Sequence, residues 1–258
     1  MFTLALILYG LRIYTRIFPT FKLASTDYII SVAVLFVVTG FGCSMAAMRY
    51  SYGRHSYYVS SADQTKIIKR IFITGFLGWW ASSLARISIG TMLLRFQISN
   101  TWRVVLWILI SIQLGMVLTA NICQLLLCSP IRANWEYVPN AVCWPPIKTQ
   151  IFSYVYSGMG VCSDPIFAIM PVVFIYSLNR PAMERVLMGV LMALGIVAVV
   201  AGGMKLYYTN TFAIGADLLR DALPLFMWFR VEEIALVASS SAPFLKSPIE
   251  RTLNRLGI

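Results

Sequence analysis

Long apolar runs separated by short polar connectors dominate the chain. Six of these runs approach or exceed the ~20 apolar residues that a helix needs to cross a bilayer. They cover residues 27–48, 71–94, 104–127, 151–178, 186–208 and 222–243. Together with a shorter run at the start, this pattern predicts an all-α fold, a polytopic membrane bundle of about seven transmembrane helices.

The first run, residues 1–11, is shorter than the others. At about 1.5 Å per residue it reaches only about half of a ~30 Å hydrocarbon core. A signal peptide would have a basic segment before its apolar run and a small-residue cleavage site after it, and the sequence has neither. We therefore expect a truncated first helix, followed by a basic connector over residues 12–22 that carries Arg12 and Arg16.

Composition supports a location in the lipid bilayer. Hydrophobic residues make up 59% of the chain and charged residues 12%, whereas soluble domains are typically about 25% charged. We expect one seven-helix domain over residues 1–245 and a basic cytoplasmic tail over residues 246–258. The net charge of +11 does not indicate a nucleic-acid partner, because lysines and arginines stand mostly at the ends of apolar runs, where they meet lipid headgroups.

Basic residues do not decide which side of the bundle faces the cytoplasm. The connectors on one side carry ten of them and those on the other side carry nine. Cys128 and Cys143 flank one polar loop, and we expect a disulfide between them if this loop faces an oxidising compartment. The pair therefore favours an outside location for that loop. With a single histidine and no CxxC sequence, no metal site is expected.

Charged residues inside the apolar runs are the main candidate chemistry. Asp164 is the only formal charge of the run 151–178. An ionisable group at membrane mid-depth costs at least ~2.5 kcal/mol and normally has a partner inside the bundle. Arg86 and Glu232 lie near the middle of their own runs, so we expect all three side chains to meet. They form either a switch or ligand pocket that selects between helix arrangements, or a fixed network that holds the helices in register.

Two loop residues are ligand candidates on the side of the 128–143 loop. His55 would bind a ligand or sense pH near neutrality; alternatively, it packs against the 128–143 loop. Trp135 would stack on a ligand or, alternatively, anchor its loop at the membrane interface.

A set of landmarks follows a characteristic order along nearly the whole chain. They are the 12–16 connector and Asp27, the 53–55 loop, the 85–89 stretch with Leu94, Arg95 and Phe96, then Trp102, then Cys128, Pro130, Trp135 and Cys143, Asp164 with Pro171 and Leu178, and finally Glu232 with Ser241, Ala242, Pro243 and Leu245. The ordered set resembles the fungal rhodopsin domain integral membrane proteins, the group that includes relatives of the satratoxin-cluster membrane protein and of the fungal Pth-type receptors.

The resemblance implies a seven-helix plasma-membrane or endomembrane protein with its N-terminus outside and, for some members, a receptor-like role. The chain departs from the family at two positions. Asp27 stands alone where many members have a pair of acids, and Gly160 stands where many have Asn four residues before the intramembrane acid.

The family name suggests retinal, which forms a Schiff base with a lysine of the last helix. The run 222–243 has no lysine, so we expect neither retinal nor another cofactor. We expect Lys205, near the end of the run 186–208, to extend its amine to the membrane interface.

Catalytic motifs such as a Ser-His-Asp set or HExxH are absent from the sequence. Adjacent Glu232 and Glu233 would point about 100° apart on a helix, so we do not expect an enzyme.

These observations favour a non-catalytic protein of receptor type. It would bind a small molecule or a surface cue between its helices, on the side of residues 53–55 and 128–143, and the opposite side would signal to a cytoplasmic partner. The alternative is a transporter, or a membrane accessory of small-molecule metabolism, with a path along Arg86, Asp164 and Glu232. Inverted repeats of hydropathy would favour the transporter, and none is clear in the sequence.

Overall fold

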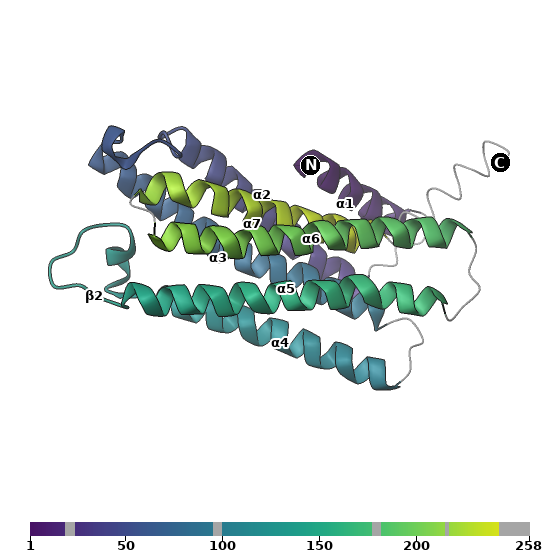
Figure 1. The fold of residues 1–258 in the computed structure, drawn as a ribbon. Coiled ribbons are helices and arrows are strands. Elements are labelled where there is room, and N and C mark those ends of the chain that lie inside the picture. The colour runs from purple at the N-terminus through teal and green to yellow at the C-terminus, as the bar shows by residue number, and fades with distance from the viewer. Residues whose placement is uncertain (19–23, 95–99, 177–181, 215–216, 243–258) are drawn as a thin grey trace.

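A computed structural model describes residues 1–18, 24–94, 100–176, 182–214 and 217–242. Within these ranges, seven α-helices run up and down, side by side, in one bundle (Figure 1). They are α1 Phe2–Ile17, α2 Ser25–Met48, α3 Ser61–Leu93, α4 Asn100–Leu125, α5 Pro146–Tyr176, α6 Ala182–Ile214 and α7 Leu218–Ser241. The predicted all-α bundle is therefore confirmed. The predicted tail, residues 246–258, lies outside the described residues.

Three of the described helices are long and apolar enough to cross a bilayer: α2, α4 and the Gly189–Thr211 part of α6. Their mean hydropathies are 2.2, 2.0 and 2.0, and at most 33% of each span is buried inside the bundle. The remaining surface of these helices exposes large apolar side chains such as Leu35, Trp107 and Ile196. Many exposed apolar side chains along helices of this length are stable in lipid and not in water, so the chain is a membrane protein.

α1 extends beyond the predicted apolar run, so Arg12 belongs to a helix and the connector predicted over residues 12–22 is wrong for its first part. The Arg12 guanidinium is buried and donates to Asp27 Oδ1 of α2 at 2.8 and 3.0 Å. It also donates to the carbonyl oxygen of Ser240 in α7, at 2.6 Å. A paired arginine does not need water, and this charge therefore does not end the helix. We call Arg12, Asp27 and the Ser240 carbonyl the α1 clamp.

α3 begins at Ser61, well before the apolar run that starts at residue 71. The hydroxyl of Ser60 accepts a hydrogen bond from the backbone N–H of Asp63 and caps the helix. Lys66 pairs with Asp63 one turn along, at 3.0 Å, which supports the first turns. Hydropathy marks only the part of a helix that meets an apolar environment, and these polar turns extend past it.

α6 approaches α5 closely at two glycines. A Cβ atom on Gly195 would lie 2.5 Å from the Cβ of Ala168, and one on Gly202 would lie 2.7 Å from Val161 Cγ2. Neither position has room for a side chain, so the glycines permit the close approach. This packing holds the polar residues of α5 and α6 at a fixed separation in the centre of the bundle.

One end of the bundle, which we call the loop end, carries residues 49–60 and 126–145 (left in Figure 1). Here β1 Cys128–Ser129 pairs antiparallel with β2 Val142–Cys143. Cys128 and Cys143 lie opposite each other and form a disulfide, so this prediction is confirmed. Two short 3-10 helices, η1 Ser56–Tyr58 and η2 Ile131–Asn134, lie at the same end.

Candidate functional site

The centre of the bundle holds four charged side chains from four helices. The Arg86 guanidinium of α3 donates to both carboxylate oxygens of Asp164 in α5, at 2.7 and 3.1 Å, and to Glu232 Oε1 in α7 at 2.5 Å. Lys205 of α6 donates to Glu232 Oε2, also at 2.5 Å. Each side chain is 6% exposed or less. We call these residues the charge network. The structure thus brings together the three charges named from the sequence and adds a fourth.

The fourth member corrects an expectation from the sequence. Lys205 does not extend to the membrane interface, because its ammonium is buried beside Glu232. Charge balance is the signal that could have found it. The interiors of the predicted spans hold three acids but, without Lys205, only two arginines, Arg86 and Arg230. A buried acid normally has a cationic partner. Three acids therefore required a third cation, and Lys205 is the remaining one inside the predicted spans.

α7 also carries an ion pair of its own. Arg230 donates to Glu233 Oε2 at 2.5 Å, one turn along the helix. Glu232 and Glu233 thus face different partners, which agrees with their offset of about 100° around the helix. The Arg230 guanidinium packs against α2, where a Cβ atom on Gly40 would lie 2.8 Å from it. This pair lies on the α2 side of α7, whereas the charge network lies on the α5 and α6 side.

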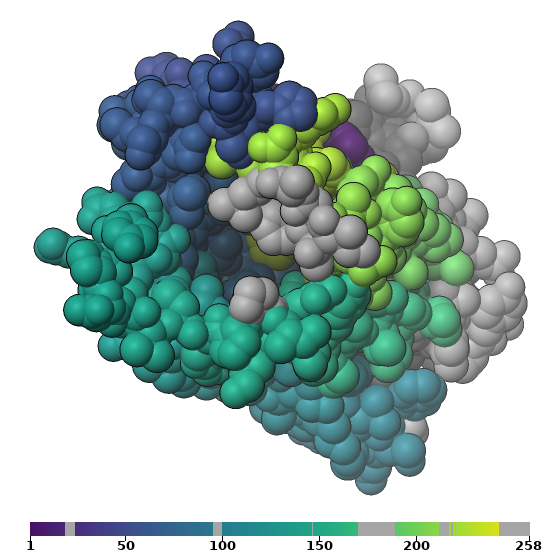
Figure 2. Space-filling view, turned by 60° about the vertical axis from the view of Figure 1, so that its left-hand side comes forward, coloured from purple at the N-terminus to yellow at the C-terminus, as the bar shows by residue number. Residues whose placement is uncertain are grey.

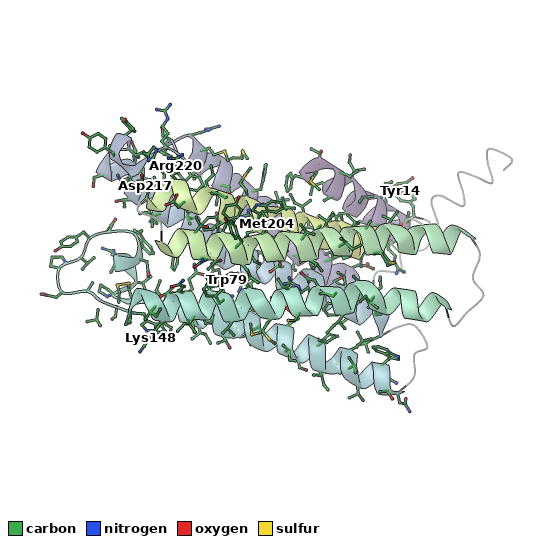
Figure 3. All side chains as sticks on the ribbon, viewed as in Figure 1. Tyr14, Trp79, Lys148, Met204, Asp217 and Arg220 are labelled. Carbon is green, nitrogen blue, oxygen red and sulfur yellow. A yellow bond between two sulfur atoms is a disulfide. The ribbon has the colours of Figure 1, made fainter. Side chains whose placement is uncertain are left out.

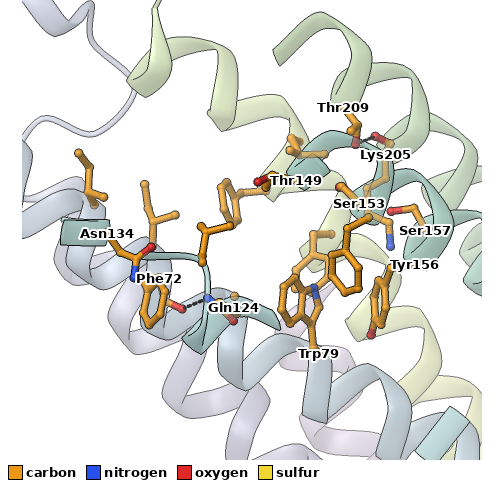
Figure 4. A pocket seen from close by; sticks show the side chains of 18 residues that line it. Phe72, Trp79, Gln124, Asn134, Thr149, Ser153, Tyr156, Ser157, Lys205 and Thr209 are labelled. Atoms are coloured by element: carbon orange, nitrogen blue, oxygen red, sulfur yellow. Dashed lines mark hydrogen bonds between the residues drawn. The ribbon is translucent and has the colours of Figure 1, made fainter. Parts of the chain in front are cut away.

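A cavity of about 320 Å³ lies between the charge network and the loop end. Figure 2 shows the molecule hollowed at this end. Helices α3 to α7 and the 126–145 loop contribute to the lining, which is mostly apolar and includes the aromatic rings of Phe72, Trp79, Phe152, Tyr156, Phe226 and Phe229 (Figure 4). Among the described lining residues, Lys205 is the one that carries a charge. We call this space the main cavity.

Trp135 lies at the border of the main cavity and is not among its described lining residues. Its ring meets Phe72 of α3 edge to face, with centroids 5.5 Å apart. The ammonium of Lys69 lies 5.6 Å from the Trp135 ring centroid. Through these contacts Trp135 fixes the 126–145 loop against α3, while its neighbour Asn134 reaches the cavity itself.

His55 makes its hydrogen bonds at the start of α7. Its Nδ1 lies 2.5 Å from Asp217 Oδ2, and the guanidinium of Arg220 lies 2.7 Å from Nε2. Figure 3 places Asp217 and Arg220 together at the loop end. Because a guanidinium can only donate, Nε2 accepts and Nδ1 donates to Asp217. Hydrogen bonds from His55 and Ser56 lower the pKa of the Asp217 carboxyl below its ordinary value. This cluster, the loop-end clasp, joins residues 49–60 to α7.

An apolar outer surface, a buried ion network and an internal cavity define an α-helical membrane protein with its candidate site inside the bundle. Comparison with protein-family models then gives the family. Residues 11–251 match the fungal rhodopsin domain. Because this match covers most of the chain, the chain belongs to the fungal rhodopsin domain family, and the resemblance found in its sequence is confirmed.

One curated relative is named as a biosynthesis cluster protein. A stretch of 106 residues is 29% identical to "Fugralins biosynthesis cluster protein 2" of Gibberella zeae (strain ATCC MYA-4620 / CBS 123657 / FGSC 9075 / NRRL 31084 / PH-1). The aligned stretch covers 41% of this chain and 26% of the relative. No solved structure matches the chain.

Proposed function

We propose that the chain is a multi-pass, receptor-like membrane protein that binds a small molecule in the main cavity. In this proposal all seven helices cross the bilayer and the loop end faces outward. The opposite end meets a cytoplasmic signalling partner. The protein is not an enzyme, and it holds its ligand without a cofactor. The disulfide at the loop end supports this orientation, since disulfides persist in oxidising compartments.

The position of Lys205 carries the proposal. Lys205 lines the main cavity and, in the same side chain, belongs to the charge network. A ligand that contacts Lys205 therefore touches a group that connects α6 to Glu232 of α7 and, through Arg86, to α3. A ligand shifts a conformational equilibrium only if it binds the two states with different affinity. A change in the contact between Lys205 and Glu232 would supply such a difference.

The size and lining of the main cavity also support ligand binding. Small-molecule sites usually enclose about 300–1,000 Å³ and combine apolar walls with a few polar groups. The main cavity, at about 320 Å³, lies at the lower end of this range. Its polar lining residues are few and include Gln124, Ser157 and Thr209.

Blocking the cavity tests the proposal. Thr149 of α5 lines the main cavity, and in Thr149→Trp the indole would fill much of it. Thr119→Trp makes the same substitution on the exposed face of α4 and is the matched control. Each variant replaces the native gene in the fungus, and the transcript response to culture extracts is measured. We expect Thr149→Trp to abolish the response at an unchanged level of folded protein, and Thr119→Trp to retain it. A full response from Thr149→Trp would contradict the proposal.

A second candidate function is transport, and one observation favours it. A cavity of about 20 Å³, lined by residues that include Asp164, Phe167 and Leu236, lies on the other side of the charge network. A space of this size can hold about one water molecule. The network therefore separates two internal spaces, as a gate on a path would. In the same strains, a changed distribution of metabolites between cells and medium, with a normal transcript response, would select the transporter.

A further inference from the structure

We propose that the main cavity selects a neutral, flat aromatic molecule that carries a hydrogen-bond acceptor, such as a ketone oxygen, and that this acceptor binds Lys205. The inference rests on the proposed function, because it names the class of ligand that the cavity takes. Three features of the described lining carry it: the aromatic walls, the unused donors of Lys205 and the charge balance of the network.

The walls of the main cavity are aromatic on several sides. The Trp79 ring of α3 lies 5.5 Å from the ring of Tyr156 and 6.4 Å from that of Phe152, both on α5. On the α7 side, Phe229 lines the cavity, and its ring centroid lies 5.2 Å from the Lys205 ammonium. Rings that converge in this way favour another aromatic ring, stacked or edge to face. The body of the ligand is therefore flat and apolar.

Hydrogen-bond donors gather on the α5 and α6 side of the main cavity, where Figure 4 shows Lys205 and Thr209 near Ser153 and Ser157. A lysine ammonium has three N–H donors. One of them is used by Glu232, and the described residues offer no second hydrogen-bond acceptor to Lys205. The Thr209 hydroxyl donates to the backbone carbonyl of Lys205, and among the described hydrogen bonds the Lys205 ammonium donates to Glu232 alone. A ligand oxygen would satisfy a donor that is buried and unused.

Charge balance decides between a neutral acceptor and an anion. The network holds two cations, Arg86 and Lys205, and two carboxylates, Asp164 and Glu232. An anionic ligand at Lys205 would leave an excess negative charge inside the bundle, and a cationic ligand would meet the ammonium directly. Burying an uncompensated charge is costly. A carbonyl oxygen accepts from Lys205 without changing the balance, so the ligand is neutral.

Four probes with one common naphthalene ring separate these chemistries. 2-Acetonaphthone is a neutral acceptor, 2-ethylnaphthalene lacks the acceptor, 2-naphthoate is an anion and 1-(2-naphthyl)ethylamine is a cation. Equilibrium dialysis against nanodiscs that contain the full chain gives each Kd, with empty nanodiscs as the blank. We expect the ketone to bind about tenfold more tightly than the hydrocarbon, as a hydrogen bond from a charged donor provides. The anion and the cation should bind at least about tenfold more weakly than the ketone.

Variants at Lys205 assign the preference to this side chain. Lys205→Met should bring the ketone to the affinity of the hydrocarbon and leave the hydrocarbon unchanged. The double variant Lys205→Met/Glu232→Gln should do the same, and it keeps the neutral pair of Arg86 and Asp164 if the single variant does not fold. Lys66→Met, the same substitution outside the cavity lining, is the control and should keep the tenfold preference.

The outcomes separate this inference from the proposed function. Equal affinity for the ketone and the hydrocarbon, with both lost in Thr149→Trp, would overturn the acceptor and leave the cavity as a ligand site. Tightest binding by the anion or the cation would overturn the neutral class. If no probe binds while Thr149→Trp still abolishes the cellular response, the ligand class is wrong and the function stands. A normal cellular response from Thr149→Trp would reject the function itself.

Discussion

Two buried ion clusters in this molecule use the same groups in different surroundings. In the α1 clamp, Arg12 pairs with Asp27 across helices, and both side chains are 0% exposed. In the charge network, Arg86 pairs with Asp164 in the same way, with side chains 3% and 1% exposed. The clamp is completed by a main-chain carbonyl of α7 and lies near the apolar core between α1, α2 and α7. The charge network borders the main cavity through Lys205.

The difference shows that a buried charge does not identify a site by itself. Both clusters look alike in sequence, as an arginine and an acid in or beside apolar runs. The distinguishing feature is a side chain that belongs to the ion cluster and also lines a cavity. Among the described residues of the two clusters, Lys205 is the clearest case, because it lines the main cavity. We therefore expect changes in the clamp to affect stability alone, and changes in the network to affect stability and ligand response together.

The largest effect is expected from Arg86→Met. This change removes the cation that pairs with Asp164 and shares Glu232, and it leaves Asp164 as a buried carboxylate without its partner. Breaking one side of a buried ion pair typically costs about 4 kcal/mol. The free energy of unfolding, measured by denaturant titration in detergent, should fall by about this amount, and the cellular response should be lost.

The double variant Arg86→Met/Asp164→Leu is the control for that change. It removes both charges, so no uncompensated carboxylate remains at α5, and Glu232 keeps Lys205 as its partner. We expect it to recover part of the lost stability but none of the response. A double variant that restores the response as well would mean that the network only holds the helices in register.

Gly202→Leu is expected to have the next largest effect, because it separates the two helices that hold Asp164 and Lys205. The new side chain would meet Val161 of α5, and overpacking of this kind costs about 3 kcal/mol or less. Gly203→Leu is the matched control, since a Cβ atom there meets nothing within 4 Å. Thermal melting should drop for Gly202→Leu and stay near the wild-type value for Gly203→Leu. Equal melting temperatures would mean that α5 and α6 do not need this close contact.

Asp27→Asn tests the other side of the comparison. The substitution removes the charge that accepts two hydrogen bonds from Arg12, while Arg12 keeps the Ser240 carbonyl. Removing the charge from one partner of a buried ion pair is costly, but the Asn amide oxygen can still accept from Arg12. The free energy of unfolding should therefore fall by less than in Arg86→Met, by about 2 kcal/mol. Binding of 2-acetonaphthone and the cellular response should not change. A loss of response at normal stability would show that the clamp takes part in signalling and would break the distinction between the two clusters.

The helices could be predicted from the sequence because their apolar runs are long, but the ends of several could not. α1 continues through Arg12 and α3 begins at Ser61. In both cases a hydrogen bond to another residue allows the helix to include polar positions, and a hydropathy average does not register such a bond. Arg12 donates to Asp27 in the neighbouring helix. The helix that begins at Ser61 is capped by the hydroxyl of Ser60. An averaged hydropathy depends on residue type alone. A charged residue that is paired through tertiary contacts is therefore wrongly assigned to a connector.

The candidate site was predictable only in part, for a related reason. Asp164 required a partner, and Arg86 and Glu232 were the charges at matching depth. The place of Lys205 depended on the rotation of α6 and on its close approach to α5 at Gly202. Neither can be obtained from the hydropathy of a single helix. The main cavity has no counterpart in the sequence at all, because it is a space between five helices and a loop.

The smallest effect concerns the loop-end clasp, which is partly exposed, unlike the α1 clamp and the charge network. The Asp217 carboxylate is 32% exposed and accepts from His55 and from the backbone of Ser56. Arg220 and Asp221 are the other charged groups that contact this cluster. Because the Asp217 carboxylate is partly exposed and can exchange protons with solvent, its contribution should be visible as a pH dependence of stability.

The direction of this dependence follows from the pKa of Asp217, which the hydrogen bonds from His55 and Ser56 lower from an ordinary value of 3.8. A carboxyl whose pKa is lower in the folded state stabilises the fold fully above its unfolded value and loses this contribution as pH falls through the folded value. The melting temperature of the wild type should therefore exceed that of Asp217→Asn above about pH 4, and the gap should close as the pH falls further. Glu136→Gln, which removes an exposed carboxylate without an ion pair among the described residues, should show no such change. A difference in melting temperature that stays constant down to acid pH would mean that His55 does not stabilise the ionised form of Asp217. The loop-end clasp would then depend on packing and not on the charge of Asp217.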